Sequence, residues 1–175
     1  MTPEQIKESI RTAFASVEKP PYWRIADSNE GDEPERLRQE FAKVPAWDSL
    51  TPAFLDKTPG GYGSALSFFS DEAFRYYLPA YLIADLEKSL KCANPVFQLT
   101  HGLDDSSALK RVNPRRYGDR TFDDLARHRF SLFTLQQCAA IGTYLQYKAA
   151  KDTFSASPIQ SALNNYWLGR ASSHR

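Results

Sequence analysis

The longest apolar segment of the chain lies at residues 69–86, where the apolar positions repeat at the spacing of an α-helix. One apolar stripe consists of Phe74, Tyr77, Leu78, Tyr81, Leu82 and Leu86. A second apolar face consists of Tyr76, Ala80 and Ile83. A helix with two apolar faces is typical of a domain interior. Ser70 is a suitable N-cap for it, and the two acidic residues that follow complement the helix dipole, so we expect this helix to be the centre of the fold.

Pro79 modifies the picture of one straight central helix. Proline has no backbone N–H, and its ring clashes with the carbonyl four residues earlier, here that of Arg75. We therefore expect a kink or a break between about Tyr76 and Leu78, with helical halves at residues 71–77 and 79–90. The tyrosines that cluster at this bend make it the first place to look for a site.

The first half of the chain shows three further helix starts. Thr2, Pro3 and Gln5 form a capping-box pattern, which predicts an N-terminal amphipathic helix at residues 1–19. A short helix is expected from Pro34 to before Pro45, with these charged residues facing solvent: Glu35, Arg36, Arg38 and Glu40. The Thr-Pro pair at residues 51–52 predicts another short helix, through about residue 56.

The second half of the chain repeats these capping signals. Thr121 is expected to begin a helix that ends near Arg129, and Thr134 begins another with a capping box. In the first of these, Phe122 and Leu125 should face inward. In the second, Ala139 and Gly142 are small enough to let a neighbouring helix approach closely. A third capping box, at residues 157–160, predicts a last helix that stops at Gly169, followed by a frayed tail at residues 171–175.

Residues 91–120 carry turn signals and little regular pattern, so we expect a long loop there, of the kind that is often functional or mobile. No segment alternates with period two for long enough to require a strand. The best strand candidate, residues 65–69, would have nothing to pair with. The sequence therefore predicts a mostly α protein: a single compact multi-helix domain over residues 1–175, around a proline-kinked central helix, with long irregular loops and little or no sheet.

Composition narrows the function classes. The 175 residues favour one domain, and an aromatic content of 13% indicates a core packed ring against ring. The formal net charge of +1 argues against wholesale electrostatic binding of nucleic acid or of an anionic membrane. No apolar run approaches the roughly 20 residues that span a bilayer. Cys92 and Cys138 form no CxxC pair, and reduced thiols in a cytoplasmic protein are the plain interpretation.

Four short strings resemble the signature of a bacterial domain family of unknown function. They are Phe74-Arg75-Tyr76-Tyr77-Leu78-Pro79-Ala80-Tyr81-Leu82, Arg129-Phe130-Ser131-Leu132-Phe133-Thr134-x-x-Gln137, Tyr144-Leu145-x-Tyr147 and Ala162-Leu163-x-x-Tyr166-Trp167. The resemblance covers roughly residues 47–167. It implies a bacterial helical domain, and it carries no activity, substrate or site residue over to this chain.

The common catalytic and metal-binding patterns are missing from the sequence. The glycine-rich residues 58–63 lack the lysine of a Walker loop and a preceding strand, so a turn is favoured over a phosphate cradle. His101, His128 and His174 form no i, i+4 pair, and no serine lies in a GxSxG setting. We expect no metal and no cofactor, and the sequence favours a role without catalysis.

The sharpest local feature is the basic stretch at residues 110–120, which holds five positive charges and one negative charge. Arg115 and Arg116 could grip phosphates or carboxylates. The alternative, which we favour, is that nearby aspartates pair with these bases and hold the segment to the body. Asp85 is unusual because it lies on the apolar stripe of the central helix, where a carboxylate needs a partner or a cleft. A structural partner is favoured over a catalytic role.

Three hypotheses follow. The first is a non-enzymatic protein-binding domain, with an unknown protein partner and with a homo-oligomer left open. The second is a small-ligand-binding protein or enzyme with a site near Asp85 and residues 101–120, for which the candidate binding residues are Asp85, Tyr77, Tyr81, His101, Arg115 and Arg116. The third, which the charge balance disfavours, is nucleic-acid binding through the basic stretch.

Overall fold

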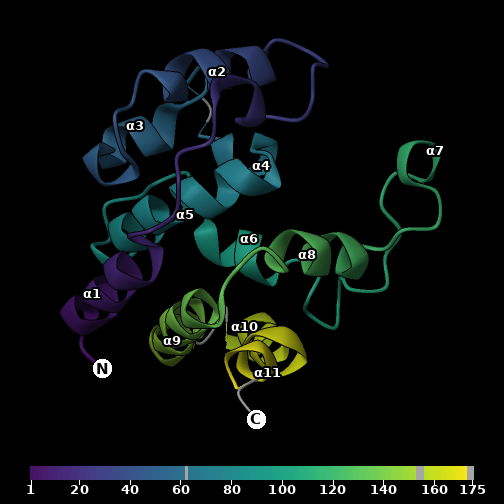
Figure 1. Cartoon of the computed structure of the whole chain (residues 1–175). Coiled ribbons are helices and arrows are strands. Elements are labelled where there is room, and N and C mark those ends of the chain that lie inside the picture. Colours follow the sequence, from purple (N-terminus) through teal and green to yellow (C-terminus); the bar gives the residue numbers. More distant parts are fainter. Residues whose placement is uncertain (62, 153–155, 173–175) are drawn as a thin grey trace. The chain divides into compact units, whose positions relative to one another are not determined.

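The computed structural model describes residues 1–61, 63–152 and 156–172, and these residues are mostly helical. Within those ranges there is no strand, and the one β-type pairing is an isolated antiparallel bridge between Arg111 and Thr121. The prediction of a mostly α fold with little or no sheet is confirmed. The contacts divide the chain into two compact units, Thr2–Pro95 and the part from Val96 onward (Figure 1). The single domain expected from the length stays a prediction.

The unit Thr2–Pro95 is organised around one buried helix. Its elements are α1(Pro3–Phe14), the 3₁₀ turn η1(Tyr22–Arg24), α2(Glu33–Ala42), the 3₁₀ turn η2(Trp47–Ser49), α3(Pro52–Lys57), α4(Ala65–Phe68) and α5(Asp71–Leu86). Helix α5 is buried on most of its surface and packs against α1, α3 and η2. The segment that was the best strand candidate forms helix α4.

The start of α5 follows the sequence signals closely. The Ser70 hydroxyl accepts a hydrogen bond from the backbone N–H of Ala73 at 3.1 Å and donates one to the carbonyl of Arg24. Phe69 and Phe74, which flank this cap, are both buried, as a hydrophobic staple requires. The predicted central position of this helix is confirmed within its unit.

The predicted break at Pro79 is wrong, because α5 continues through that residue as one helix. Both neighbours of Pro79, Leu78 and Ala80, are buried, so packing on both sides holds the segment helical against the local cost of proline. A bend without a break stays a prediction. The helix also ends at Leu86 rather than at residue 90, because Lys88 adopts a left-handed conformation with φ of 56°.

An aromatic cluster joins α2, α3 and α5. The ring of Phe41 on α2 lies 5.0 Å from that of Phe54, 4.8 Å from that of Phe69 and 4.7 Å from that of Tyr77. The hydroxyl of Tyr77 donates a hydrogen bond to the carbonyl of Phe41 at 3.3 Å. The expected ring-against-ring packing is therefore present, and it fixes the position of α2 over α5.

Two predictions about this unit need correction. Helix α1 has the predicted Thr2 cap but ends at Phe14, because the chain turns there to reach the extended pair at residues 20–21. Arg38, expected in solvent, is buried. Its guanidinium donates to the carbonyls of Ala26 and Ser28 and to the side chain of Asn29, each at 2.8 Å. These acceptors repay the burial of the charge and hold the segment before α2 in place.

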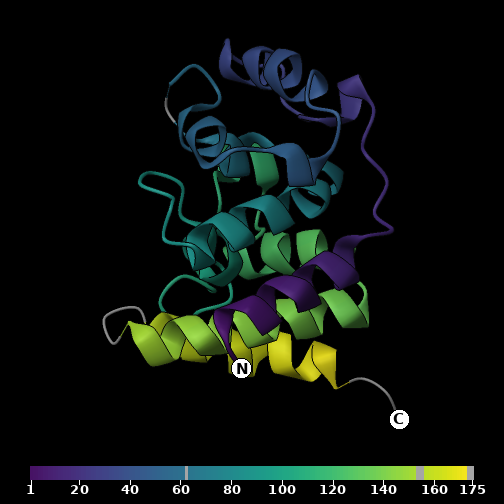
Figure 2. The same cartoon turned by 90° about the vertical axis from the view of Figure 1, so that its left-hand side faces the viewer.

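The unit from Val96 onward is built around its longest helix, which contacts the three helical segments that end the described part of the chain. Its elements are α6(Pro95–Thr100), which begins one residue earlier, α7(Pro114–Tyr117), α8(Phe122–Phe130), α9(Leu135–Lys151), α10(Ala156–Ala162), the π-helical turn η3(Leu163–Trp167) and α11(Leu168–Ala171). Figure 2 shows α10 and α11 running beside α9. Trp167 is fully buried, contacts the rings of Phe130 and Phe133, and donates through its indole N–H to the carbonyl of Leu99 at 3.0 Å.

Several local expectations for this unit are wrong. Residues 91–120 contain α6 and α7, so they are more regular than a single long loop. Phe122 and Leu125 of α8, expected to face inward, are only half-buried, whereas Ala126 and Phe130 of the same helix are buried. Ala139 is exposed, and nothing packs closely on Gly142.

The last helix also differs from its prediction at both ends. Helix α10 begins at Ala156, so Ser157 lies inside the helix rather than at its cap. Gly169 continues the helix to Ala171, since Arg170 anchors the final turn by donating to the carbonyl of Phe133 at 3.0 Å. The predicted frayed tail lies mostly outside the described residues.

Candidate functional site

Residues 110–120, the basic loop, form a closed and folded projection from the unit that starts at Val96. The backbone N–H of Val112 donates to the carbonyl of Arg120, and that of Phe122 donates to the carbonyl of Lys110, both at 3.0 Å. Asn113 caps α7 inside the loop, and Gly118 ends α7 with φ of 63°, a conformation that favours glycine. Figure 1 shows α7 at the far end of this projection from α8.

The charges of the basic loop are only partly paired. Arg111 forms an exposed ion pair with Asp119 at 3.2 Å, which supports the interpretation that local acids pair with the bases. Arg116 lies over the ring of Tyr117, 5.5 Å from its centroid. Lys110 and Arg115 form no ion pair with any residue that the structure describes, and both are exposed. The loop therefore presents cations that the fold itself does not use.

The segment that precedes the basic loop is ordered by Asp104, which is buried and accepts hydrogen bonds from the Ser106 hydroxyl and the Ser107 hydroxyl. Burial alone would raise the pKa of the Asp104 carboxyl, but these hydrogen bonds outweigh it and hold that pKa below its ordinary value. His101 lies between the rings of Phe97, at 4.8 Å, and Phe122, at 4.6 Å. Asp104 and His101 therefore make structural contacts next to the basic loop in sequence.

The other predicted site residues belong to the unit Thr2–Pro95. Asp85 is half-buried in the last turn of α5. Tyr77 and Tyr81 are fully buried on the same helix, and burial raises the pKa of both phenols well above its ordinary value. The hydroxyl of Tyr81 has no hydrogen-bond partner among the described residues. These two tyrosines are core residues, so they do not line a binding groove.

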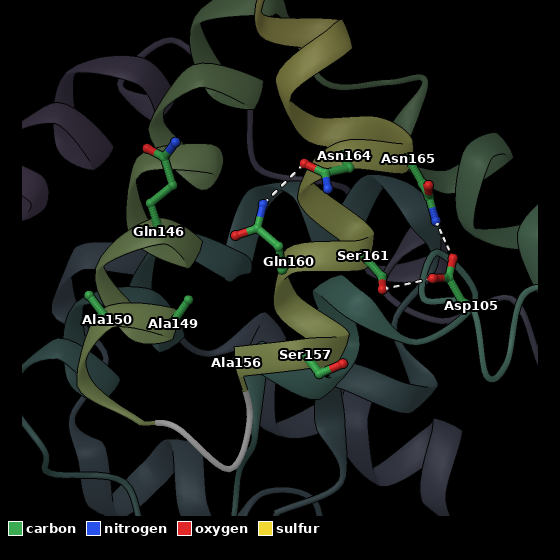
Figure 3. Close-up of a pocket in the computed structure, with 10 residues that line it drawn as sticks. All are labelled: Asp105, Gln146, Ala149, Ala150, Ala156, Ser157, Gln160, Ser161, Asn164 and Asn165. Carbon is green, nitrogen blue, oxygen red and sulfur yellow. Dashed lines mark hydrogen bonds between the residues drawn. The ribbon is translucent and has the colours of Figure 1, made fainter.

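A polar pocket of 710 Å³ lies between the end of α9 and the run from α10 to η3 (Figure 3). Its lining residues are Asp105, Gln146, Ala149, Ala150, Ala156, Ser157, Gln160, Ser161, Asn164 and Asn165. The Asp105 carboxylate accepts from the Ser161 hydroxyl at 3.1 Å and from the Asn165 amide at 3.0 Å. The same amide donates to the carbonyl of Leu103 at 2.9 Å, so residues 103–105 are fixed against the pocket.

The π-helical turn η3 contributes Asn164 and Asn165 to the lining of this pocket. A π turn inserts an extra residue and leaves carbonyls without their usual helical partner. The carbonyl of Asn165 accepts from the guanidinium of Arg127 at 3.2 Å. In η3, the side-chain oxygen of Asn164 accepts a hydrogen bond from the side-chain amide of Gln160 at 3.0 Å. The amide N–H groups of the Asn164 side chain stay available to a ligand. Sequence reasoning missed this pocket, since nothing in a single capping pattern signals a π turn.

The described residues contain no constellation typical of catalysis. No group of three metal-ligating side chains occurs in the described part of the chain. Both cysteines are free thiols, and burial raises the pKa of Cys138, which disfavours a nucleophilic role for it. Across residues 1–61, 63–152 and 156–172, no helix combines the length and apolar character needed to cross a bilayer.

These features define an all-helical protein with a projecting basic loop and a polar pocket. By sequence comparison, residues 2–171 match the family model described as a family of unknown function (DUF6714), and the chain belongs to this family. The resemblance to a family of unknown function is therefore confirmed, and it extends to the N-terminal residues as well. No curated protein and no solved structure matches the chain significantly.

Proposed function

We propose that this protein is a non-enzymatic binding protein that recognises an acidic surface of a protein partner through the basic loop. The observation that carries the proposal is that the loop is folded by its own backbone and caps while leaving Lys110 and Arg115 unpaired. Leu109, at its base, is 87% exposed. An exposed apolar side chain beside unpaired cations suits a protein surface that offers carboxylates around an apolar contact.

The charge balance favours a protein over nucleic acid as the partner. Binding of a phosphate backbone depends on several neutralised phosphates, and the whole chain carries a formal net charge of only +1. Asp119 also lies within the loop and pairs with Arg111. Nucleic-acid binding through the same loop is therefore the weaker candidate, and the experiment below separates the two.

A photo-crosslinking amino acid placed at Leu109 tests the proposal in cells of the source organism. We expect a discrete protein adduct that disappears when Arg115 and Arg116 are both changed to Glu, because charge reversal repels an acidic partner. The same crosslinker at Leu132, an exposed leucine of the same unit, is the matched control and should not give this adduct. Identical adducts from both positions would refute the proposal.

Nuclease treatment distinguishes the two macromolecular partners. A protein adduct that persists after nuclease digestion and weakens with salt agrees with the proposal, since exposed charges are screened over about 8 Å at physiological ionic strength. An adduct that is lost on digestion would replace the protein partner with nucleic acid. Circular dichroism of the double variant checks that the helical fold is retained.

A second candidate function is the binding of a small polar ligand in the pocket of Figure 3. The observation that favours it is a cavity of a size usual for ligands, lined by amides and hydroxyls from α9, α10 and η3. Ala149→Trp would fill this pocket from α9. A ligand recovered with the protein should be lost in this variant and retained when Ala139, exposed on the same helix, is changed to Trp.

The setting of this function is part of the proposal. The free thiols of Cys92 and Cys138 support a reducing, cytoplasmic location. A bacterial origin, a homo-oligomeric state, and an enzyme or ligand site near Asp85 stay predictions. Size measurement of the purified protein would answer the question of self-association directly.

A further inference from the structure

Glu40, on α2, has a carboxylate oxygen without a partner. Its Oε2 atom is buried, and no described residue donates a hydrogen bond to it. No ion pair of Glu40 occurs among the described residues either. A buried carboxylate oxygen normally accepts at least one hydrogen bond, because its lost hydration is otherwise not replaced. An exception of this kind in a folded protein calls for an explanation.

Glu40 lines a pocket of 460 Å³ between the end of α2 and the start of α3. Its lining residues are Glu40, Lys43, Val44, Pro45, Ser49, Leu50, Thr51, Phe54 and Thr58. The walls are largely apolar, and Phe54 packs against the fully buried Phe41 at 5.0 Å, so this part of the wall is fixed by the core. The volume falls within the range of small-molecule sites in proteins.

The lysines at the C-terminal end of α2 leave the Glu40 carboxylate available. Lys19 donates to the carbonyls of Ala42, at 3.1 Å, and of Val44, where it caps the C-terminal end of α2. Lys43 lines the pocket but is exposed, and it makes no ion pair with Glu40 in the part of the chain that the structure describes. Its ammonium therefore stays hydrated at the rim.

We propose that this pocket binds a small amphiphilic cation, a molecule with an apolar body and a protonated primary amine. The apolar body would displace water from the walls at Val44, Leu50 and Phe54, and the ammonium would donate to the Glu40 carboxylate. The terminal torsion of a glutamate is broad, so a small rotation brings the unpartnered oxygen toward such a donor. The ligand supplies the hydrogen bond that the fold leaves out.

Three probes of one shape test this assignment: 2-phenylethylammonium, 2-phenylethanol and 3-phenylpropanoate. Each is titrated into the isotopically labelled full-length protein, and the backbone amide NMR signals of Leu50 and Phe54 are followed. We expect the ammonium to bind at least tenfold more tightly than the alcohol, and the carboxylate to bind most weakly, because a charge-assisted hydrogen bond to a carboxylate is among the stronger kinds. Equal binding of the three, or no binding of the ammonium, would overturn the assignment.

Glu40→Gln removes the charge while it keeps the shape of the side chain. In this variant the ammonium should bind about tenfold more weakly, and the alcohol should bind as before. The matched control is Glu33→Gln, an exposed carboxylate on the same helix, in which all three affinities should be unchanged. Unchanged ammonium binding in the Glu40 variant would also overturn the assignment. The probe ranking in the unaltered protein needs no variant, so it decides the matter if that variant misfolds.

This site is independent of the basic loop, because all its residues lie in the unit Thr2–Pro95. The Arg115 and Arg116 charge-reversal variant should therefore bind 2-phenylethylammonium with unchanged affinity. If the basic loop binds no protein partner, the expected binding of 2-phenylethylammonium is unchanged. If the ammonium does not bind, the proposed partner binding is equally unaffected.

Discussion

Two buried tyrosines on α5 differ in whether their hydroxyls have a hydrogen-bond partner. Tyr77 donates to the carbonyl of Phe41, whereas the buried hydroxyl of Tyr81 has no partner among the described residues. Removing an unsatisfied buried hydroxyl costs no hydrogen bond and saves its desolvation. We expect Tyr81→Phe to leave the free energy of unfolding unchanged or to raise it, by up to about 2 kcal/mol. Urea denaturation followed by circular dichroism measures this.

Tyr77→Phe is the matched comparison, since it makes the same change one turn earlier on the same helix. It leaves the Phe41 carbonyl without its donor and should lower the free energy of unfolding by about 1 kcal/mol. The order of the two variants is the decisive result. A Tyr81 variant that is clearly less stable than the Tyr77 variant would show that the Tyr81 hydroxyl has a partner.

The ionisation of the Asp104 carboxyl makes the stability of the fold depend on pH. Its carboxyl pKa is held below the ordinary value in the folded state, so its stabilising effect is fully present above the ordinary aspartate pKa of about 4. That stability is lost as the pH falls through the lowered pKa of the folded protein. We expect Asp104→Asn to lower the free energy of unfolding at pH 7 by about 1–3 kcal/mol and to reduce the loss of stability between pH 5 and pH 2.

Denaturant unfolding at a series of pH values measures this difference. Asp105→Asn is a suitable control, because Asp105 is an exposed neighbour that bonds to different partners. If the Asp104 variant and the unaltered protein lost stability in parallel on acidification, the hydrogen bonds from Ser106 and Ser107 would not control this carboxyl.

At the scale of the element, α5 ends at a position where the backbone conformation is unfavourable for the residue that occupies it. The N–H of Ser89 donates to the carbonyl of Ala84, and that of Lys88 to the carbonyl of Asp85, both at 3.0 Å. This is a Schellman motif, in which the left-handed position is most often glycine. Lys88 occupies it with φ of 56°. We expect Lys88→Gly to raise the free energy of unfolding by about 0.5–1 kcal/mol.

The adjacent Glu87 has right-handed helical geometry, so it provides the internal control. Glu87→Gly should instead lower the free energy of unfolding relative to Glu87→Ala, since glycine loses more chain entropy on folding. Alanine is the reference because both variants remove the ion pair between Glu87 and Lys7, at 2.9 Å. Thermal unfolding followed by circular dichroism compares the two. The same sign for both variants would contradict the assigned end of α5.

Capping residues account for most of the structure that could be predicted from the sequence. Thr2, Ser70, Thr121 and Thr134 each cap the helix that their local pattern predicts. A cap depends on a hydrogen bond within three residues, so the signal is contained in a short stretch of sequence. The helix ends were less predictable, because they depend on where the chain must turn next.

The sites depend on contacts that no local pattern contains. The pairing of Asp105 with Ser161 and Asn165 joins residues that are 56 and 60 positions apart. The burial of Arg38 depends on acceptors in a preceding irregular segment whose course the sequence did not indicate. Glu40 was likewise expected in solvent. Helical periodicity indicates which residues share a face of a helix, but it does not indicate which other segments cover that face.

At the scale of the whole molecule, the remaining question is whether the two units fold separately. The unit from Val96 onward has its own buried centre, made of Trp167, Phe130, Phe133 and Tyr144. A chain of about 80 residues can bury enough surface to fold alone, although with a small margin. We expect a fragment of residues 94–175, which keeps the start of α6 intact, to be helical and to unfold cooperatively.

Trp167 is the one tryptophan of that fragment, so its fluorescence reports on this core directly. A folded fragment should show emission at shorter wavelength than the urea-unfolded fragment, because the indole is fully buried and bonded to the carbonyl of Leu99. Loss of that difference in Leu99→Pro, alongside retention in the exposed-site variant Leu132→Ala, would tie the signal to this contact. A fragment that is unfolded alone and becomes helical only when residues 1–93 are added would instead support the single domain that the length of the chain favours.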